Sequence, residues 1–144
     1  MKKILFILFA LCAVPLSTQA QEKDIIITNE WARPILAAGR PGGAYFHVEN
    51  KGNTADKLIK VSSTISPRVE IHEHTMKDGV MKMSQVEGGL EIPAGGSVEL
   101  KPGGYHIMIF ETATKYQEGD KVELTLYFEN AGEITKTLNV MKKR

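Results

Sequence analysis

The sequence has very little cysteine: among its 144 residues the only one is Cys12. Cys12 lies in an N-terminal segment that we expect to be removed, so the remaining chain would have no disulfide, thiolate nucleophile or thiolate metal ligand. A blue-copper electron-transfer site, which needs a cysteine thiolate, is thereby excluded. The fold must then be stabilised by its apolar core alone, which a domain of about 120 residues can achieve.

The sequence also lacks an excess of charge, a repeat and any long stretch with helical periodicity. Without Lys2 and Lys3 of the N-terminal segment, the 18 basic side chains become 16, against 17 acidic ones, and the net charge is −1. This balance offers no basic face for nucleic acid and no acidic disordered tail. No nucleophile–base constellation is visible, so we expect a binding protein and not an enzyme.

The N-terminal segment has the pattern of a secretory signal. Residues 1–20 begin with two lysines, continue with an apolar run over residues 4–14, and end in small or polar residues. This pattern predicts export and cleavage after Ala20, which leaves one domain over residues 21–144. The apolar run is short for a membrane span, so an uncleaved anchor is the weaker alternative. Lipid attachment at Cys12 is disfavoured because Leu11 stands where a small residue is required.

Short alternating apolar runs separated by Gly, Pro, Asn and Asp fill the rest of the chain. This pattern is typical of an all-β protein, and nine short strands in one domain predict a Greek-key β-sandwich. We expect the strands at Ile25–Trp31, Ala44–Glu49, Lys57–Val61, Val69–Thr75, Val80–Val86, Val98–Leu100, Tyr105–Phe110, Val122–Phe128 and Ile134–Val140.

The stretch "HEHTMKDGVMKM" at residues 72–83 reads as a hairpin. The Asp-Gly pair at 78–79 predicts a two-residue type I′ turn, because both central positions need a positive φ. That turn places Met76 opposite Met81 and His74 opposite Met83. Since strand side chains alternate between faces, the imidazoles and thioethers all share one face. The side chains predicted there are His72, His74, Met76, Met81 and Met83.

A second pair, His106 and Met108 in "YHIMIF", also shares one face of a strand. Thioether is a soft, neutral ligand that prefers Cu(I), and imidazole binds both oxidation states of copper. Methionine also keeps its ligand chemistry in an oxidising compartment. The pattern therefore predicts a Cu(I) site whose affinity falls as the imidazoles protonate. The alternatives are a zinc or nickel site, and a metal-free adhesion or interaction module in which methionine fills the core.

These residues give the chain a specific resemblance. It resembles the PCuAC (DUF461) family of periplasmic copper chaperones, whose signature is H-x10-M-x21-H-x-M. His72 and Met83 have the signature spacing, His106 and Met108 supply H-x-M, and the gap between the two halves is one residue longer here. The stretches "WARP", "GAYFHVEN" and "VELKPGGYHIMIF" also look familial, so the resemblance covers nearly the whole exported chain.

The resemblance implies a cupredoxin-like β-sandwich and a periplasmic copper chaperone. We expect a monomer, with weak self-association through the exposed methionines or a metal-bridged dimer as the alternative. Its acceptor would be cytochrome oxidase subunit II, which carries a copper centre, or a thiol-bearing copper protein. The implied primary Cu(I) ligands are His72, Met83, His106 and Met108. The hairpin register, which puts His74 opposite Met83, adds His74, Met76 and Met81 as second-tier candidates.

Three other side chains are expected to be structural. We predict Trp31 in the core, because a lone tryptophan is a large apolar side chain. His47 lies outside the signature, so we expect a structural or solvent-facing role for it. Glu70 is expected to be solvated.

Overall fold

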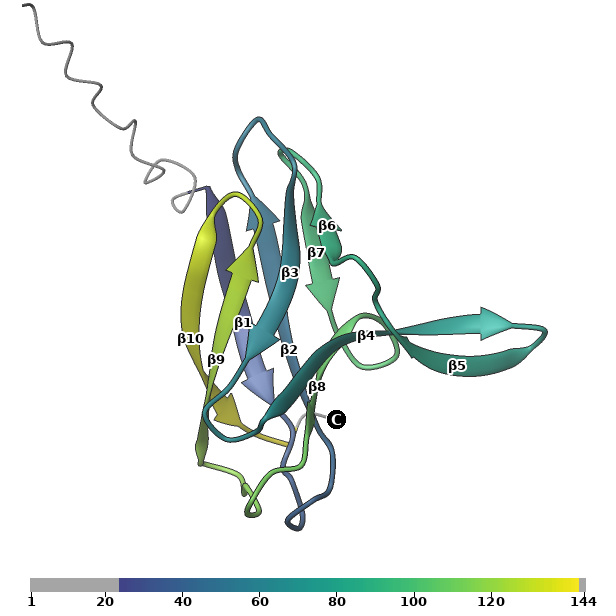
Figure 1. Cartoon of the computed structure of the whole chain (residues 1–144), viewed down its shortest axis with the longest axis vertical. Coiled ribbons are helices and arrows are strands. Elements are labelled where there is room, and N and C mark those ends of the chain that lie inside the picture. The colour runs from purple at the N-terminus through teal and green to yellow at the C-terminus, as the bar shows by residue number, and fades with distance from the viewer. Residues whose placement is uncertain (1–23, 143–144) are drawn as a thin grey trace, which may run out of the picture.

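The computed structural model describes residues 24–142, and within them every regular element is a β-strand (Figure 1). The predicted signal segment and its cleavage point lie outside the described residues. No helix long and apolar enough to cross a membrane occurs in the described part of the chain. The ten strands are β1 (Ile25–Ala32), β2 (Gly42–Asn50), β3 (Asp56–Ser62), β4 (Arg68–Lys77), β5 (Val80–Gln85), β6 (Leu90–Ile92), β7 (Ser97–Leu100), β8 (His106–Phe110), β9 (Lys121–Phe128) and β10 (Gly132–Val140).

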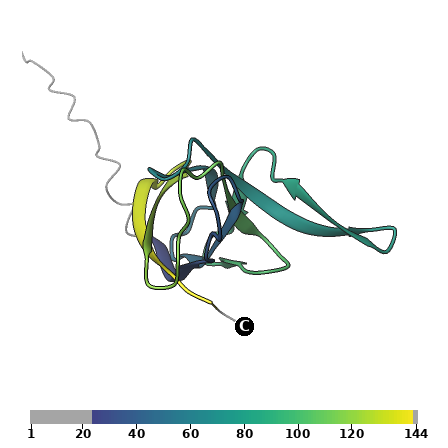
Figure 2. The ribbon, with the colours of Figure 1, turned by 90° about the horizontal axis from the view of Figure 1, so that it is seen from below.

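Hydrogen bonds join the strands into one continuous sheet in the order β5-β4-β8-β2-β1-β10-β9-β3-β6, with β7 added to β2. The sheet curls around an interior, which is visible when the molecule is viewed from below (Figure 2). β1 lies between β2 and the last strand β10, with which it pairs in parallel. The expected single all-β, cupredoxin-like domain is confirmed.

All nine predicted strands are present, and β6 is an additional one. β6 is only three residues long and pairs with β3 through Leu90 and Leu58. Its Leu90 and Ile92 are buried, so a short segment between "EGG" and "PAGG" contributes to the core. Two apolar residues next to turn-forming glycine and proline carry too little alternation to be read as a strand.

The core follows the two-residue period of the strands. In β9 the buried residues alternate with outward-facing ones, from Val122 to Phe128. β2 is buried along most of its length, with β1 paired to one edge and β7 and β8 paired to the other. Trp31 is buried, as predicted, and stacks on Tyr45 with ring centroids 4.5 Å apart.

One hairpin leaves this body. Residues 68–72 of β4 pair with β8, whereas the rest of β4 pairs only with β5. All six residues of β5 are exposed, and the hairpin projects to one side of the molecule (Figures 1 and 2). Asp78 and Gly79 have φ values of 53° and 75°, as a type I′ turn requires. The predicted register is confirmed, with the pairs Met76–Met81 and His74–Met83.

Candidate metal centre

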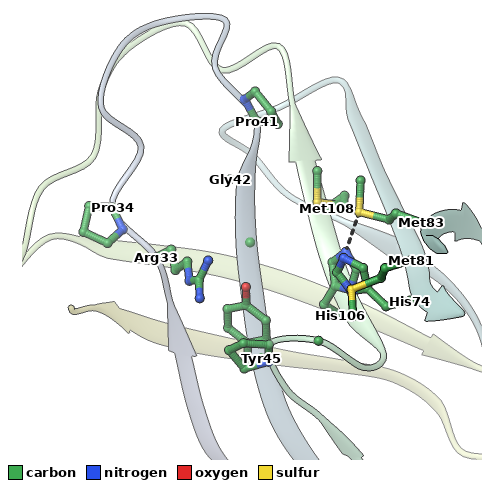
Figure 3. Close-up of a pocket in the computed structure, with 13 residues that line it drawn as sticks. Arg33, Pro34, Pro41, Gly42, Tyr45, His74, Met81, Met83, His106 and Met108 are labelled. Atoms are coloured by element: carbon green, nitrogen blue, oxygen red, sulfur yellow. Dashed lines mark hydrogen bonds between the residues drawn. The ribbon is translucent and has the colours of Figure 1, made fainter. Parts of the chain in front are cut away.

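The predicted ligands come together from two parts of the sheet, the projecting hairpin and the central strand β8. β4 lies between β5 and β8, and pairs His72 with His106 and Glu70 with Met108. A pocket of about 420 Å³ opens on this face (Figure 3). The predicted ligands that line it are His74, Met81, Met83, His106 and Met108. His72 and Met76 are not among its lining residues.

His106 is held with one nitrogen aimed at sulfur. Its Nδ1 lies 2.9 Å from the carbonyl oxygen of Gly104, and its Nε2 lies 3.2 Å from Sδ of Met83. A carbonyl oxygen only accepts, so Nδ1 carries the hydrogen and Nε2 of the neutral ring presents a lone pair. Two ligand atoms bonded to one tetrahedral metal ion at zinc-like bond lengths lie about 3.5 Å apart. His106 and Met83 therefore lie close to the separation that a shared metal ion requires.

His72 is also oriented by a partner. Its Nε2 lies 2.7 Å from Oε2 of Glu70, and its Nδ1 is buried without a hydrogen-bond partner. Since a carboxylate accepts, Nε2 carries the hydrogen and Nδ1 is left with a lone pair. Metal-binding histidines are commonly held in this way by an outer carboxylate. The expectation that Glu70 is solvated is wrong, because the β4 alternation places it beside His72 on the same face.

His74 approaches the same ring from the hairpin. It is directly opposite Met83, and its ring stacks on that of His106 with centroids 4.9 Å apart. Its Nδ1 is buried and has no hydrogen-bond partner. Two unpartnered imidazole nitrogens on β4 thus lie next to His106. Buried polar atoms are normally paired, so these two call for a ligand or a bound atom.

The surroundings of His106 favour its neutral form. Burial lowers its pKa, the hydrogen bond to Gly104 partly opposes this, and the nearby His74, His72 and Arg33 lower it further. A neutral imidazole is the form that binds a metal ion. Among residues 24–142, no group of three or more His, Cys, Asp or Glu side chains is placed to hold a metal ion. The side-chain donors of the predicted ligands that line the pocket are imidazole and thioether.

The methionine face of the hairpin is accessible. The residues Met76, Met81 and Met83 are 66%, 58% and 47% exposed. The metal-free alternative needs this face to be packed as core, and the exposure of β5 contradicts that packing. Met76 lies furthest from β8 and outside the pocket, whereas Met81 and Met83 line it.

Comparison with known proteins identifies the family. Residues 25–140 match the "LpqE-like" family model. The chain belongs to the LpqE-like (PCuAC, DUF461) family. A protein of Leifsonia xyli subsp. xyli named "Putative lipoprotein Lxx21020" is 30% identical over 125 residues, which cover 83% of this chain and 74% of that protein.

Solved structures of PCuAC domains share the fold. The structure titled "Copper-bound PCuAC domain from PmoF2" is 28% identical, with a TM-score of 0.70, over 83% of this chain and 94% of that one. The structure of CuI-DR1885 from Deinococcus radiodurans, 22% identical with a TM-score of 0.59, covers 90% of this chain and 87% of that one, and supports the fold alone.

The opposite wall of the pocket in this PCuAC-family chain was not predicted. Arg33, which follows β1, and Tyr45 of β2 face the histidine–methionine wall across Gly42 and Gly43 (Figure 3). Sequence reasoning missed Arg33 and Tyr45 because it cannot tell that β2 pairs with β8. No spacing in the sequence links either residue to the histidines.

Proposed function

We propose that this protein is a periplasmic copper chaperone that binds one Cu(I) ion in the pocket between β8 and the hairpin. The observation that carries the proposal is the contact of 3.2 Å between the lone-pair nitrogen of His106 and the thioether of Met83. Thioethers suit Cu(I) and are poor ligands for harder ions, and imidazole binds copper as well. The copper-bound PmoF2 domain, at 28% identity, supports the same cargo for this chain.

The proposed primary ligands are Nε2 of His106 and the thioethers of Met83 and Met108, which line the pocket, together with Nδ1 of His72. His72 does not line the pocket, but its ring centroid lies 5.9 Å from that of His106. Both histidine nitrogens are the ones left without a hydrogen by the partners at the other ring nitrogen. His74 and Met81, at the pocket wall nearer the hairpin tip, form a second tier that meets the ion as it enters or leaves. Met76 is the second-tier candidate with the weakest support, because it lies outside the pocket.

The arrangement favours transfer over retention. Met83 lies on an exposed strand and Met108 is half-buried, so an incoming ligand reaches the thioethers without opening the core. Each neutral ligand can be replaced by one from an acceptor, and the copper stays Cu(I) throughout. No step needs a nucleophile or a general base, so the proposed role is binding and delivery without catalysis.

The proposed acceptor is the copper centre of cytochrome oxidase, in subunit II, or a thiol-bearing copper protein that precedes it. The family resemblance supports this choice, and a periplasmic location fits the signal-like pattern of residues 1–20. We propose that the chain is cleaved near Ala20 and works as a monomer.

An anaerobic Cu(I) competition titration tests the proposal. The wild type is expected to bind one Cu(I) per chain tightly, with Zn(II) unable to compete. Met83→Ala and Met108→Ala should each lower the Cu(I) affinity by at least about tenfold to 100-fold, the loss already caused by removing an outer partner that only orients a metal ligand. Met76→Ala is the matched control, with the same change on the same hairpin outside the pocket, and should bind like the wild type.

Comparison of His72→Ala with His74→Ala tests the ligand set. His72→Ala should cause the larger loss of Cu(I) affinity, since His72 is the histidine whose free nitrogen is fixed by a carboxylate. A folded wild-type protein that does not bind Cu(I) would overturn the proposed function.

A further inference from the structure

The pocket has a second wall with chemistry unlike that of the first. The backbone N–H of Arg33 donates to the carbonyl oxygen of Gly43 over 2.8 Å, which ties the end of β1 to β2. The guanidinium of Arg33 lies 5.6 Å from the ring centroid of Tyr45. Gly43 pairs with Met108 in the register of β2 and β8. Arg33 and Tyr45 are therefore anchored to the strand that lies next to the metal-binding wall.

Gly43 makes room for the tyrosine hydroxyl. A Cβ atom at Gly43 would lie 2.7 Å from the hydroxyl oxygen of Tyr45, so the hydroxyl passes over the bare glycine. Within residues 24–142, no hydrogen bond is made by this hydroxyl, and no ion pair is made by the guanidinium of Arg33. Figure 3 shows both groups on the side of the pocket that faces His106 and the methionines.

The charge of this wall is unbalanced. Arg33 is the only residue lining the pocket that carries a full charge, since no Asp or Glu lines it. A bound Cu(I) ion with neutral ligands would add a second positive charge. Arg33 is exposed, so its guanidinium is open to a ligand. An anion between this guanidinium and a cation cargo would be stabilised by both charges, and the planar donor fork of arginine matches a carboxylate.

We propose that Arg33 and the Tyr45 hydroxyl form a carboxylate-binding subsite, so that the loaded pocket accepts a ligand that presents a thiol to Cu(I) and a carboxylate to Arg33. This inference rests on the proposed function and names the chemistry of the ligand that takes the copper. The free mercapto acid and a cysteine beside an acidic residue of an acceptor protein share this chemistry.

The exchange step is balanced without any redox change. The thiol loses its proton to solvent, its thiolate forms a bond to Cu(I), and one copper–thioether bond breaks. The copper remains Cu(I). The carboxylate meanwhile accepts hydrogen bonds from the guanidinium of Arg33 and the hydroxyl of Tyr45. The soft sulfur of the ligand binds Cu(I) on the histidine–methionine side of the pocket, and its carboxylate oxygens bind Arg33 on the opposite side. These two contacts fix the orientation of the ligand.

The test compares 3-mercaptopropionate with its methyl ester, which keeps the thiol and loses the carboxylate charge. Each is titrated anaerobically into the Cu(I)-loaded full-length protein, and formation of the ternary complex is followed by ultraviolet copper–thiolate absorption. The wild type should bind the acid about threefold to tenfold more tightly than the ester. Arg33→Gln should abolish this preference, and Tyr45→Phe should reduce it.

Arg40→Gln is the matched control, because it removes the same charge from a nearby exposed arginine that does not line the pocket. It should keep the full preference for the acid. Arg33→Gln should hold Cu(I) itself at least as tightly as the wild type, since removal of a like charge does not weaken cation binding. Equal binding of acid and ester by the wild type, or an undiminished preference in Arg33→Gln, would overturn the subsite.

A metal-free measurement separates this inference from the proposed function. Propionate, which has no sulfur, is titrated into the copper-free protein while the side-chain Nε–H signal of Arg33 is followed by NMR. A saturable shift in the wild type that is absent at high salt supports the subsite even if Cu(I) binding fails. No shift, together with no acid preference, overturns the subsite even if Cu(I) binding succeeds.

The source of the ligand is separated with two peptides, one holding Cys next to Glu and one holding Cys next to Gln. If the Glu peptide takes Cu(I) about threefold to tenfold faster, and only when Arg33 is present, the subsite is supported with a protein acceptor as its ligand. If both peptides react alike while 3-mercaptopropionate keeps its Arg33-dependent preference, the subsite is supported with a free mercapto acid as its ligand.

Discussion

The Nε2 atom of His106 and the Sδ atom of Met83 lie 3.2 Å apart, although the two residues are 23 positions apart in the chain. They also belong to strands that do not pair, because β4 lies between β5 and β8. Met83 thus reaches His106 over the surface of β4. A slip of one residue between β4 and β5 would turn Met83 to the other face, so the hairpin register decides whether the contact exists.

The turn at the hairpin tip should therefore control copper affinity from a distance. Gly79 has a φ of 75°, and no atom lies within 4 Å of an added Cβ, so Gly79→Ala adds backbone strain without a clash. We expect it to destabilise the hairpin by about 1 kcal/mol and to weaken Cu(I) binding by up to about fivefold, because only the fraction of molecules with the correct register binds. Hydrogen exchange should rise in β5 and stay unchanged in β9.

Gly95→Ala is the control for that prediction. Gly95 has a φ of 62° and the same open space, but it lies in the turn between β6 and β7, outside the residues that line the pocket. It should produce similar strain and leave the Cu(I) affinity unchanged. Equal affinities of the Gly79→Ala and wild-type proteins would show that the register is held by the strands alone.

Glu70 should tune the site without touching the ion. Its carboxylate fixes the ring of His72 over 2.7 Å, and loss of such outer partners commonly costs about tenfold to 100-fold in metal affinity. We expect that loss in Glu70→Ala, measured by Cu(I) competition, and a partial recovery in Glu70→Gln, whose amide oxygen still accepts. Glu73→Ala, on the other face of β4, should bind as the wild type does. An unaffected Glu70→Ala protein would remove His72 from the proposed ligand set.

The copper-free protein should become more stable as pH rises through the range where histidine titrates. The pKa of His106 lies below its ordinary value of 6.5 in the folded chain, chiefly because of burial. Near that pH the unfolded chain binds more protons than the folded chain, so the free energy of unfolding increases with pH. The contribution of a neutral His106 to stability is present above pH 6.5 and is lost as the pH falls below it. Urea denaturation of the wild type between about pH 5 and pH 7 should show this slope.

His106→Gln is the companion variant for the pH measurement. It cannot titrate, so its slope of stability with pH should be smaller than that of the wild type. A wild-type slope that is flat, or a variant slope that is equally steep, would mean that burial of His106 does not carry the effect.

Asp56 should be important for stability and irrelevant to copper. It is buried, and its carboxylate accepts backbone N–H donors from Lys57, Asn130 and Ala131 over 2.7 to 2.9 Å. Asp56→Ala leaves these donors unsatisfied, and we expect a loss of about 3 kcal/mol in the free energy of unfolding. Chemical denaturation measures the loss, and Cu(I) titration of the folded fraction should give the wild-type affinity. A loss below about 1 kcal/mol would contradict this role.

The hairpin and its register were predictable because the signal is local. The Asp-Gly pair at 78–79 allows one turn type, and that turn determines every facing pair from Lys77–Val80 to His74–Met83. The proposed ligand pairs His72–Met83 and His106–Met108 also stand close enough in sequence for spacing to be informative. Their ligation of copper stays a prediction.

The other half of the pocket depends on pairings that no local pattern reveals. Tyr45 faces the site because β2 pairs with β8, and Arg33 does so because β1 is interrupted by a bulge between Thr28 and Trp31. Asn29, inside that bulge, has a φ of 56°, which shifts the side-chain alternation of the residues after it. The partnership of Glu70 with His72 was missed for a simpler reason, since a charged residue was taken to be solvated although alternation places it on the ligand face.

The division of β4 between the body and the hairpin has a mechanical consequence. Met83 stands on a projecting arm, whereas His106 and Met108 stand on a strand held on both sides. An ion bound to all three residues would cross-link the hairpin to the rest of the sheet, as a disulfide does. Unlike a disulfide, the metal–ligand bonds break without a reductant. Full and empty molecules would then differ in how easily a protease cuts the arm. The copper ion would act as a reversible cross-link, and the rate of cleavage at the exposed hairpin tip would show whether the ion is bound.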